Sequence, residues 1–217
     1  MRRIAIQIEY DGTDFTGWQS QVQGRTVQNV VEDAAARATG CDGRVVVHGA
    51  GRTDAGVHAA GQVAHFDTDS ELQPAEMVRA LNYWLPDDAG VLAAQEAPES
   101  FHARFSAIGK LYRYRLLFSR ERRPLRERYC LRVFDPVDVD VLNGCAARVV
   151  GEHDFVSFTS SGSSVDSTVR TIGRSEWLPA GDELHYMVEG NGFTYNMVRA
   201  LVGTMLAIDV LVWRRWT

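Results

Sequence analysis

The order of strand-like and helix-like segments constrains this chain most, because nearly the same order occurs twice along it. Alternating apolar and polar residues indicate strands, and apolar residues three or four positions apart indicate helices. Thr26 is a typical N-cap residue of a helix, and Gly40 and Pro86 are a glycine and a proline of the kind that follow the end of a helix. The first half therefore predicts strand, helix, strand, strand, helix and strand at residues 3–10, 27–39, 44–48, 61–67, 74–85 and 91–94.

The second half repeats this order but lacks its last strand. It predicts a strand, a helix, two strands and a helix at residues 104–118, 138–150, 169–178, 184–190 and 194–208. Residues 209–217 contain no turn signal, so we expect a chain that is truncated or altered at this end. The strand at 104–118 would then lie unpaired on one side. We expect a marginally stable, aggregation-prone protein that is weakly active or inactive unless the tail or a partner subunit fills that edge.

Two tandem split βαβ halves predict an α+β fold of the ferredoxin-like or RNA-recognition-like kind. We expect these halves, residues 1–100 and 101–217, to join into one mixed, mainly antiparallel sheet. Helices would cover one face of this sheet and leave a groove on the other. RNA-recognition modules bind RNA on such an open face, although a shared topology alone is only an analogy.

The charge of the chain is unevenly distributed. The formal net charge is −5, but residues 101–132 contain nine arginines and Lys110 against only Glu121 and Glu127. This stretch therefore carries +8 and the remainder −13, a pattern that fits a local site for a polyanion. A solvated arginine-rich loop is an equally good interpretation of the charge alone.

Other features narrow the class of protein. No apolar run approaches the roughly 18 residues of a membrane span, and no signal-peptide core follows Met1, so we expect a cytoplasmic protein. Cys41, Cys130 and Cys145 are too scattered for a disulfide framework, and we interpret all three as buried small side chains.

The glycine-rich segment at residues 48–59 carries the clearest chemical signal. Its glycines allow tight turns and close approach to a ligand, and Asp54 places a carboxylate between two predicted strands. Arg52 could pair with this carboxylate or with a phosphate. By itself, however, an Arg-Thr-Asp sequence in such a loop is more typical of an Asx turn with a solvated arginine.

A longer set of motifs resembles the A-type, anticodon-loop tRNA pseudouridine synthases and covers about residues 3–208. The segments that carry this resemblance are 10–13 with Phe15, Gly17, Trp18 and Gln19, then 26–28, 49–59, 61–66, 101–107 with Lys110, Tyr112 and Tyr114, then 154–158, and 197–199 with Gly203. Their order along the chain is the order expected for the family.

The resemblance implies an isomerase that needs no cofactor. Asp54 would be the catalytic carboxylate, acting as nucleophile or base, Tyr112 would stack on the target base or remove a proton, and Arg199 would be the counter-charge to Asp54. The substrate would be uridine at positions 38, 39 and 40 of the tRNA anticodon stem-loop, bound by a homodimer. From pattern alone, a core aromatic is the better interpretation of Tyr112, and Arg199 fits a solvated residue at the edge of an apolar helix stripe.

The resemblance and the charge pattern also indicate residues that contact RNA. These are Arg52, His58, Arg104, Lys110, Arg122, Arg123 and Arg126. His58 could instead satisfy a hydrogen bond within its loop. His58, His65 and His102 lack helical spacing or a cysteine partner, so we expect no metal site.

Two alternatives belong to other classes of protein. A noncatalytic RNA-binding or RNA-remodelling protein on the same scaffold, inactive because of a C-terminal truncation, would keep the arginines but would not need Asp54. A nucleoside or glycoside hydrolase would need a second positioned carboxylate, which the segment at 48–59 does not provide.

Overall fold

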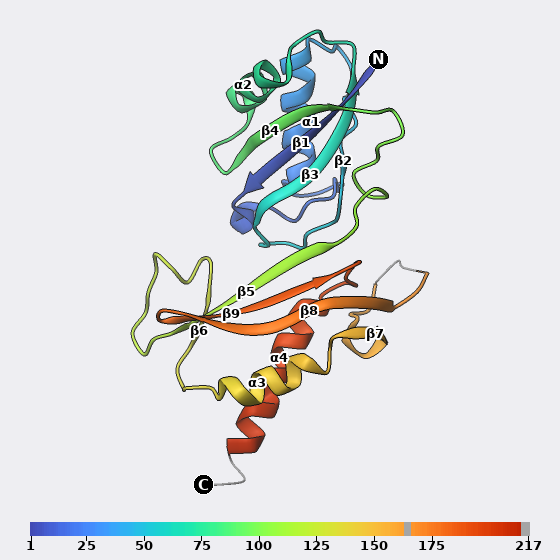
Figure 1. Ribbon diagram of the computed structural model, residues 1–217. Helices are drawn as coiled ribbons and strands as arrows, with labels where there is room; N and C mark the ends of the chain where they lie inside the picture. The colour runs from blue at the N-terminus through green and yellow to red at the C-terminus, as the bar shows by residue number, and fades with distance from the viewer. Residues whose placement is uncertain (163–165, 214–217) are drawn as a thin grey trace. The chain divides into compact units, whose positions relative to one another are not determined.

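The computed structural model describes residues 1–162 and 166–213. The chain divides into two compact units, Met1–Ala107 and Ile108–Thr217, and each is described by itself. The strands form two sheets, one in each unit (Figure 1). This arrangement confirms the α+β class and the split βαβ halves, while the joining of both sheets into one and a groove on their open face stay predictions.

The first unit has the predicted order of elements. They are β1 (Arg2–Tyr10), the 3-10 helix η1 (Gly12–Asp14), α1 (Val27–Thr39), β2 (His48–Gly49), β3 (Ala59–Thr68), α2 (Pro74–Trp84) and β4 (Ala89–Ala97). The sheet order is β2-β3-β1-β4 with antiparallel pairing throughout. The predicted strand at 44–48 is wrong in extent, because only His48 and Gly49 pair with β3.

Local chemistry explains why α1 begins and ends as predicted. The Thr26 hydroxyl accepts a hydrogen bond from the Asn29 N–H, and Gly40 adopts the left-handed conformation that closes the helix. Both helices cover one face of the sheet (Figure 1). The buried core between the sheet and these helices contains Ile4, Ile6, Ile8, Val27, Val31, Phe66, Met77 and Leu81. This core holds β1 and β3, whose ends lead into the segments that form the candidate site.

The second unit has two short strands, β6 and β7, that the sequence did not predict. Its elements are β5 (Lys110–Phe118), β6 (Leu131–Val133), α3 (Val139–Ala147), β7 (Gly151–Asp154), the 3-10 helix η2 (Val156–Phe158), β8 (Val169–Ala180), β9 (Glu183–Gly190) and α4 (Met197–Trp213). The sheet order is β6-β5-β9-β8-β7. Trp177, Tyr186, Leu142 and Leu201 belong to the buried core between this sheet and its helices.

Several sequence predictions require correction in this unit. The strand predicted from residue 104 begins at Lys110, and the last helix extends beyond residue 208 to Trp213. The edge of β5 is not entirely unpaired, because β6 runs parallel to Leu116–Phe118 on that side. Residues 214–217 lie outside the described part of the chain, and the expectation of marginal stability stays a prediction.

One cysteine is also placed differently from the prediction. Cys130 is buried and Cys145 is half-buried, but Cys41 is exposed. Cys41 directly follows Gly40, the residue that closes α1, so the chain turns away from the core at this point. A position just beyond a helix cap does not continue the apolar stripe of that helix.

Candidate active site

The loop that carries Asp54 lies between β2 and β3 and is held by the segment after β1. The Trp18 N–H donates to the Thr53 oxygen at 3.0 Å, and the Gly56 N–H donates to the Phe15 oxygen at 3.3 Å. Asp54, half-buried, lies between these two main-chain contacts, and its own backbone oxygen accepts from the Val57 N–H at 3.1 Å. Three hydrogen bonds therefore fix the backbone on both sides of the carboxylate.

A buried aromatic cluster supports the contact between the segment after β1 and the Asp54 loop. The rings of Phe15 and Trp18 lie 6.3 and 6.2 Å from the ring of Tyr10 at the end of β1. The Tyr10 hydroxyl lies 2.8 Å from the Thr53 hydroxyl, in hydrogen-bond distance. The resemblance included Tyr10, but sequence reasoning assigned it no function, whereas the structure makes it a support for the residue next to Asp54.

Two glycines allow the segment after β1 to approach the Asp54 loop. A Cβ atom on Gly12 would lie 2.1 Å from the Val57 oxygen, far inside van der Waals contact. Gly17 has a φ of +107°, and a Cβ there would lie 2.7 Å from the Thr53 oxygen. Only glycine fits at these two positions without a shift of the loop.

Arg52 and His58 flank Asp54 and contact the same segment. Arg52 is exposed, and its Nε donates to the Gln19 side-chain oxygen at 3.2 Å. The Nδ1 atom of His58 accepts from the Gly12 N–H at 3.0 Å and lies 3.0 Å from an Asp11 carboxylate oxygen. A nitrogen that accepts this bond carries no proton, so the bond to Gly12 and an ion pair with Asp11 exclude each other. His58 therefore has the loop hydrogen bond that the sequence offered as an alternative to RNA contact.

A cluster of three histidines holds the segment that follows β4. The rings of His48, His65 and His102 lie 4.7 to 5.2 Å apart. The buried Nδ1 of His65 accepts from the Ala103 N–H at 3.1 Å, and burial, with His102 and His48 nearby, lowers the pKa of His65 to about 4. Within the described residues, no group of His, Cys, Asp and Glu has an arrangement suited to a metal ion. The cluster instead positions the backbone next to Arg104, which is exposed.

Tyr112 lies in β5 of the second unit, opposite Val188 of β9. Its ring is half-buried, packs against the core of this unit and lies edge-on to the Phe193 ring, with centroids 4.9 Å apart. The alternation of side chains places Arg113 and Arg115 on the other face. Lys110 begins the same strand and pairs with Gly190. Tyr112 thus has the character of a core-edge aromatic and remains a candidate for contact with a base.

Arg199 is the third residue of α4 and is exposed. The turn before this helix is held by Thr194, whose hydroxyl lies 2.7 Å from that of Thr159, and by Asn196, whose amide donates to the Ser160 hydroxyl at 3.2 Å. Asn196 has a φ of +58°, a conformation that asparagine tolerates better than most residues. Phe193 and Arg199 therefore flank a fixed turn. Sequence reasoning missed Thr194 and Asn196, for which the only signal was an asparagine next to a helix start.

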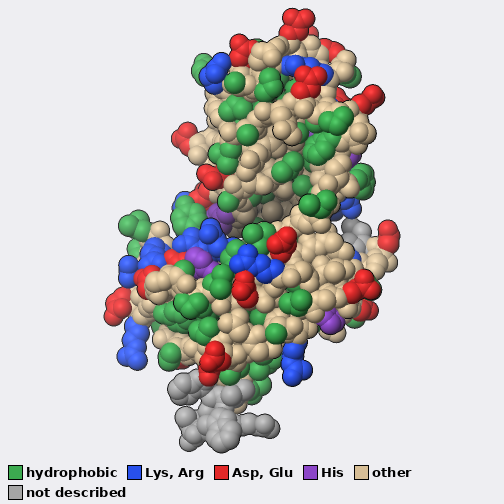
Figure 2. Space-filling model, in the orientation of Figure 1, with side chains coloured by type: hydrophobic (Ala, Val, Ile, Leu, Met, Phe, Trp, Pro, Cys, Tyr) green, Lys and Arg blue, Asp and Glu red, His purple; other side chains and the backbone are tan. Residues whose placement is uncertain are grey.

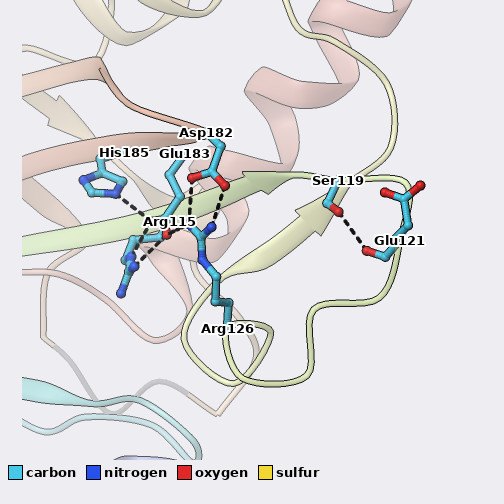
Figure 3. A network of polar contacts seen from close by, with 7 residues as sticks. All are labelled: Arg115, Ser119, Glu121, Arg126, Asp182, Glu183 and His185. Atoms are coloured by element: carbon cyan, nitrogen blue, oxygen red, sulfur yellow. Dashed lines mark hydrogen bonds and ion pairs between the residues drawn. The ribbon is translucent and has the colours of Figure 1, made fainter.

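The predicted RNA-contacting arginines of residues 119–130 are not equivalent. Arg122 and Arg123 are exposed. The guanidinium of Arg126 donates to both oxygens of Asp182, at 2.5 and 2.9 Å, and also pairs with Glu183 (Figure 3). Because two carboxylates already neutralise its charge, this placement argues against Arg126 as a phosphate ligand.

Comparison with known proteins places the chain in a family. A family model described as tRNA pseudouridine synthase matches residues 6–106 and 145–212. The tRNA pseudouridine synthase A of Geobacter sp. strain M21 is 44% identical over 208 residues, which cover 96% of this chain and 83% of that protein. The protein of the same name from Anoxybacillus flavithermus strain DSM 21510 / WK1 is 46% identical over 209 residues, with 96% and 84% covered. This chain belongs to the tRNA pseudouridine synthase family.

The family match covers the candidate site unevenly. Asp54, Arg52 and His58 lie in the first matched range, and Arg199 lies in the second. Tyr112 and the arginines of residues 119–130 fall between the two ranges. Asp54 and Arg199 thus lie within the matched ranges, and their roles stay predictions. None of the helices in the described ranges has the length and apolar character needed to cross a membrane.

We predict that Gly12→Ala disrupts the Asp54 loop. Its Cβ would meet the Val57 oxygen, so the substitution should lower the free energy of unfolding by about 2 kcal/mol and reduce turnover. Gly144→Ala is the control, because a Cβ at this α3 position meets nothing within 4 Å. That variant should be about 0.5 to 1 kcal/mol more stable. Urea unfolding and turnover assays measure both effects, and equal stability of the two variants would contradict the packing argument.

We also predict that His65 reduces stability in acid. Its pKa is about 4 in the folded protein, below the roughly 6.5 of an unfolded chain. Between these pH values the unfolded state binds a proton that the folded state does not, so stability falls as the pH falls, by at most about 3 kcal/mol. His65→Asn retains an acceptor for the Ala103 N–H without this titration.

Urea unfolding between pH 7 and 4 checks this prediction. The free energy of unfolding of His65→Asn should fall less steeply than that of the wild type. His153→Asn, at an exposed position in the second unit, should follow the wild type. An identical pH dependence of all three proteins would assign the acid sensitivity to other groups.

Proposed function

We propose that this protein isomerises uridine to pseudouridine in tRNA, with Asp54 as the catalytic carboxylate. The observation that carries the proposal is the placement of Asp54 in a loop fixed by main-chain hydrogen bonds on both sides, within the range matched by the family model. The reaction breaks the bond between the sugar carbon and N1 of uracil and forms one to C5. The C5 proton is lost and N1 gains one, so substrate and product have the same atoms.

This chemistry requires a carboxylate at the sugar and a group that removes the C5 proton. Asp54 would act at the sugar as nucleophile or base. Tyr112 would lie against the flipped uracil and accept the C5 proton, and Arg199 would face the Asp54 carboxylate. The exposure of Arg199 on a fixed helix start and the edge position of the Tyr112 ring support these assignments.

The proposed substrate is the anticodon stem-loop, bound across a cytoplasmic homodimer. Arg52, His58, Arg104, Lys110, Arg122 and Arg123 would contact the RNA, mainly through its phosphates. Arg52, Arg104, Arg122 and Arg123 are exposed, as phosphate ligands must be. Such contacts supply affinity and position the RNA without reading its sequence.

A specific observation bears on the hydrolase alternative. Asp11 brings a second carboxylate to the first unit beside the Asp54 loop, through its contact with His58. One Asp11 oxygen, however, accepts from the Thr13 N–H at 3.0 Å and from the Thr13 hydroxyl at 2.6 Å. This oxygen caps η1, so the contacts favour a structural role for Asp11 over that of a second catalytic acid.

We predict that Asp54→Asn abolishes isomerisation and leaves tRNA affinity within a few-fold of the wild type. The carboxylate serves the chemistry, and its removal beside phosphates should not weaken binding; turnover should fall by a factor of about 1,000 or more. Asp87→Asn, at an exposed position of the same unit, should retain full activity. Pseudouridine mapping on unmodified tRNA measures the product, and turnover by Asp54→Asn within about tenfold of the wild type would remove Asp54 from the mechanism.

We further predict that Arg199→Ala reduces turnover strongly, by about 100-fold near neutral pH. Without this counter-charge, the carboxylate of Asp54 would take up a proton more readily, so activity should be lost at higher pH than in the wild type. Arg148→Ala, an exposed arginine of the same unit, is the control. An unchanged pH–rate profile of Arg199→Ala would mean that the two groups are not paired.

A further inference from the structure

The arginine loop, residues 119–130, connects β5 to β6 and carries five arginines. They are Arg120, Arg122, Arg123, Arg126 and Arg128. Figure 2 shows Lys and Arg side chains gathered over this part of the second unit, with acidic side chains among them. Arginines this close repel one another, so a loop of this composition requires a compensating negative charge to adopt one conformation.

Glu183, the first residue of β9, provides such a charge from within the sheet. Its side chain is only 5% exposed. Its carboxylate accepts from Arg115 at 2.7 and 2.8 Å, lies 2.8 Å from the Nε2 atom of His185, and also pairs with Arg126 (Figure 3). These partners, Arg115 first, hold the pKa of Glu183 well below its usual range.

The contacts of Glu183 reach both the sheet and the loop. Arg115 lies in β5, whereas Arg126 lies in the arginine loop, at a turn closed by a 2.8 Å hydrogen bond from the Tyr129 N–H to the Arg126 oxygen. Burial raises the pKa of the Cys130 thiol, which ends the loop and interacts with Glu183. One buried carboxylate at the start of β9 thus joins the arginine loop, through Arg126, to β5, through Arg115.

The five arginines of the loop divide by exposure. Arg120, Arg122, Arg123 and Arg128 are exposed, while the Arg126 side chain is 28% exposed and neutralised by Asp182 and Glu183. Within the loop, the Arg123 N–H donates to the Glu127 carboxylate at 2.5 Å. The backbone of Arg123 is therefore fixed relative to the turn that Arg126 anchors.

We propose that Glu183 is a positioning residue for RNA binding: it anchors the arginine loop through Arg126 so that Arg120, Arg122 and Arg123 meet RNA phosphates from a fixed backbone. The proposal rests on the proposed function for the identity of the ligand. A fixed loop spares the complex the ordering entropy that a mobile loop would lose on binding. In this proposal Arg126 and Arg115 stabilise the structure of the loop, and the exposed arginines bind the RNA phosphates.

For Glu183→Gln, the proposal and simple electrostatics predict opposite changes in the affinity for tRNA. Glu183→Gln removes a negative charge beside the arginines, which by charge alone should tighten the binding of a polyanion. The proposal expects weaker binding, because the loop loses its anchor. We expect the Kd for tRNA to rise by about 3- to 10-fold. The log–log salt slope should become shallower by about 0.7 to 0.9 for each phosphate that the loop no longer neutralises.

Glu121→Gln is the matched control. It makes the same chemical change in the same loop, but Glu121 is exposed and its contact with Ser119 uses its backbone oxygen. Glu121→Gln should bind tRNA as tightly as the wild type or more tightly. If Glu183→Gln binds as tightly as Glu121→Gln, the proposal is overturned.

Trypsin cleavage without RNA gives an independent readout of loop order. Glu183→Gln should be cut after Arg122, Arg126 or Arg128 several times faster than the wild type and Glu121→Gln, because cleavage follows local opening. Turnover at saturating tRNA should stay within about twofold, since the anchor acts on KM and not on kcat. Equal cleavage rates in the three proteins would overturn the anchoring role.

Arg126→Gln replaces Glu183→Gln in this test if the latter does not fold, since it leaves Glu183 paired with Arg115 and His185. Its control is Arg122→Gln, which removes the same charge from an exposed position. The proposal expects the larger decrease in tRNA affinity for Arg126→Gln, although the charge of Arg126 is already neutralised. The reverse order would overturn the proposal.

The wild type separates failure of this proposal from failure of the proposed function. A wild type that binds tRNA without forming pseudouridine would refute the proposed function alone, whereas a wild type that does not bind tRNA would refute both.

Discussion

The close main-chain contact between the segment after β1 and the Asp54 loop is the constraint on which the candidate site depends. Hydrogen bonds from Trp18 to Thr53 and from Gly56 to Phe15 join the two backbones, and they form only because Gly12 and Gly17 have no side chain in the way. The carboxylate is therefore carried by a loop whose backbone is held by main-chain hydrogen bonds on both sides of Asp54. This rigidity is what a catalytic group at a sugar carbon requires, since small displacements of the attacking atom are costly.

The fold could be predicted from sequence wherever local chemistry determines it. Thr26 and Gly40 mark the ends of α1, and alternation marks β1, because caps and side-chain periodicity depend on neighbouring residues alone. β6 could not be predicted, because Leu131–Val133 is only three residues long and becomes a strand through its pairing with Leu116–Phe118. The helical state of residues 209–213 was missed for a related reason, since the expected repeat placed a strand after the helix.

The candidate site likewise combines residues that local sequence motifs predict with supporting contacts that are distant in sequence and could not be predicted. Asp54 and Arg199 were found through motifs, which record residue type at fixed spacing. The contacts that hold them, such as Tyr10 with Thr53 and Asn196 with Ser160, join residues 43 and 36 positions apart, and no local pattern records them. The partners of Arg126 were missed for the same reason, because Asp182 and Glu183 lie at the far end of a strand pair and resemble ordinary turn acids in the sequence.

The net charge of −5 is compatible with a polyanionic substrate because the positive charges are concentrated in residues 101–132 and the negative charges lie mainly elsewhere in the chain. Arg115 and Arg126 are together neutralised by Glu183 and Asp182. Because Glu183 is buried, salt screens its attraction to these arginines only weakly, so they contribute to the fold also at raised ionic strength. Arg122 and Arg123 are exposed, and their attraction to phosphate is screened as salt rises. Glu183 and Asp182 are neutralised by the arginines that they hold, so the net negative charge lies on the other acidic residues of the chain. We expect this charge to repel RNA that does not reach the exposed arginines, and background binding of RNA should therefore be weak.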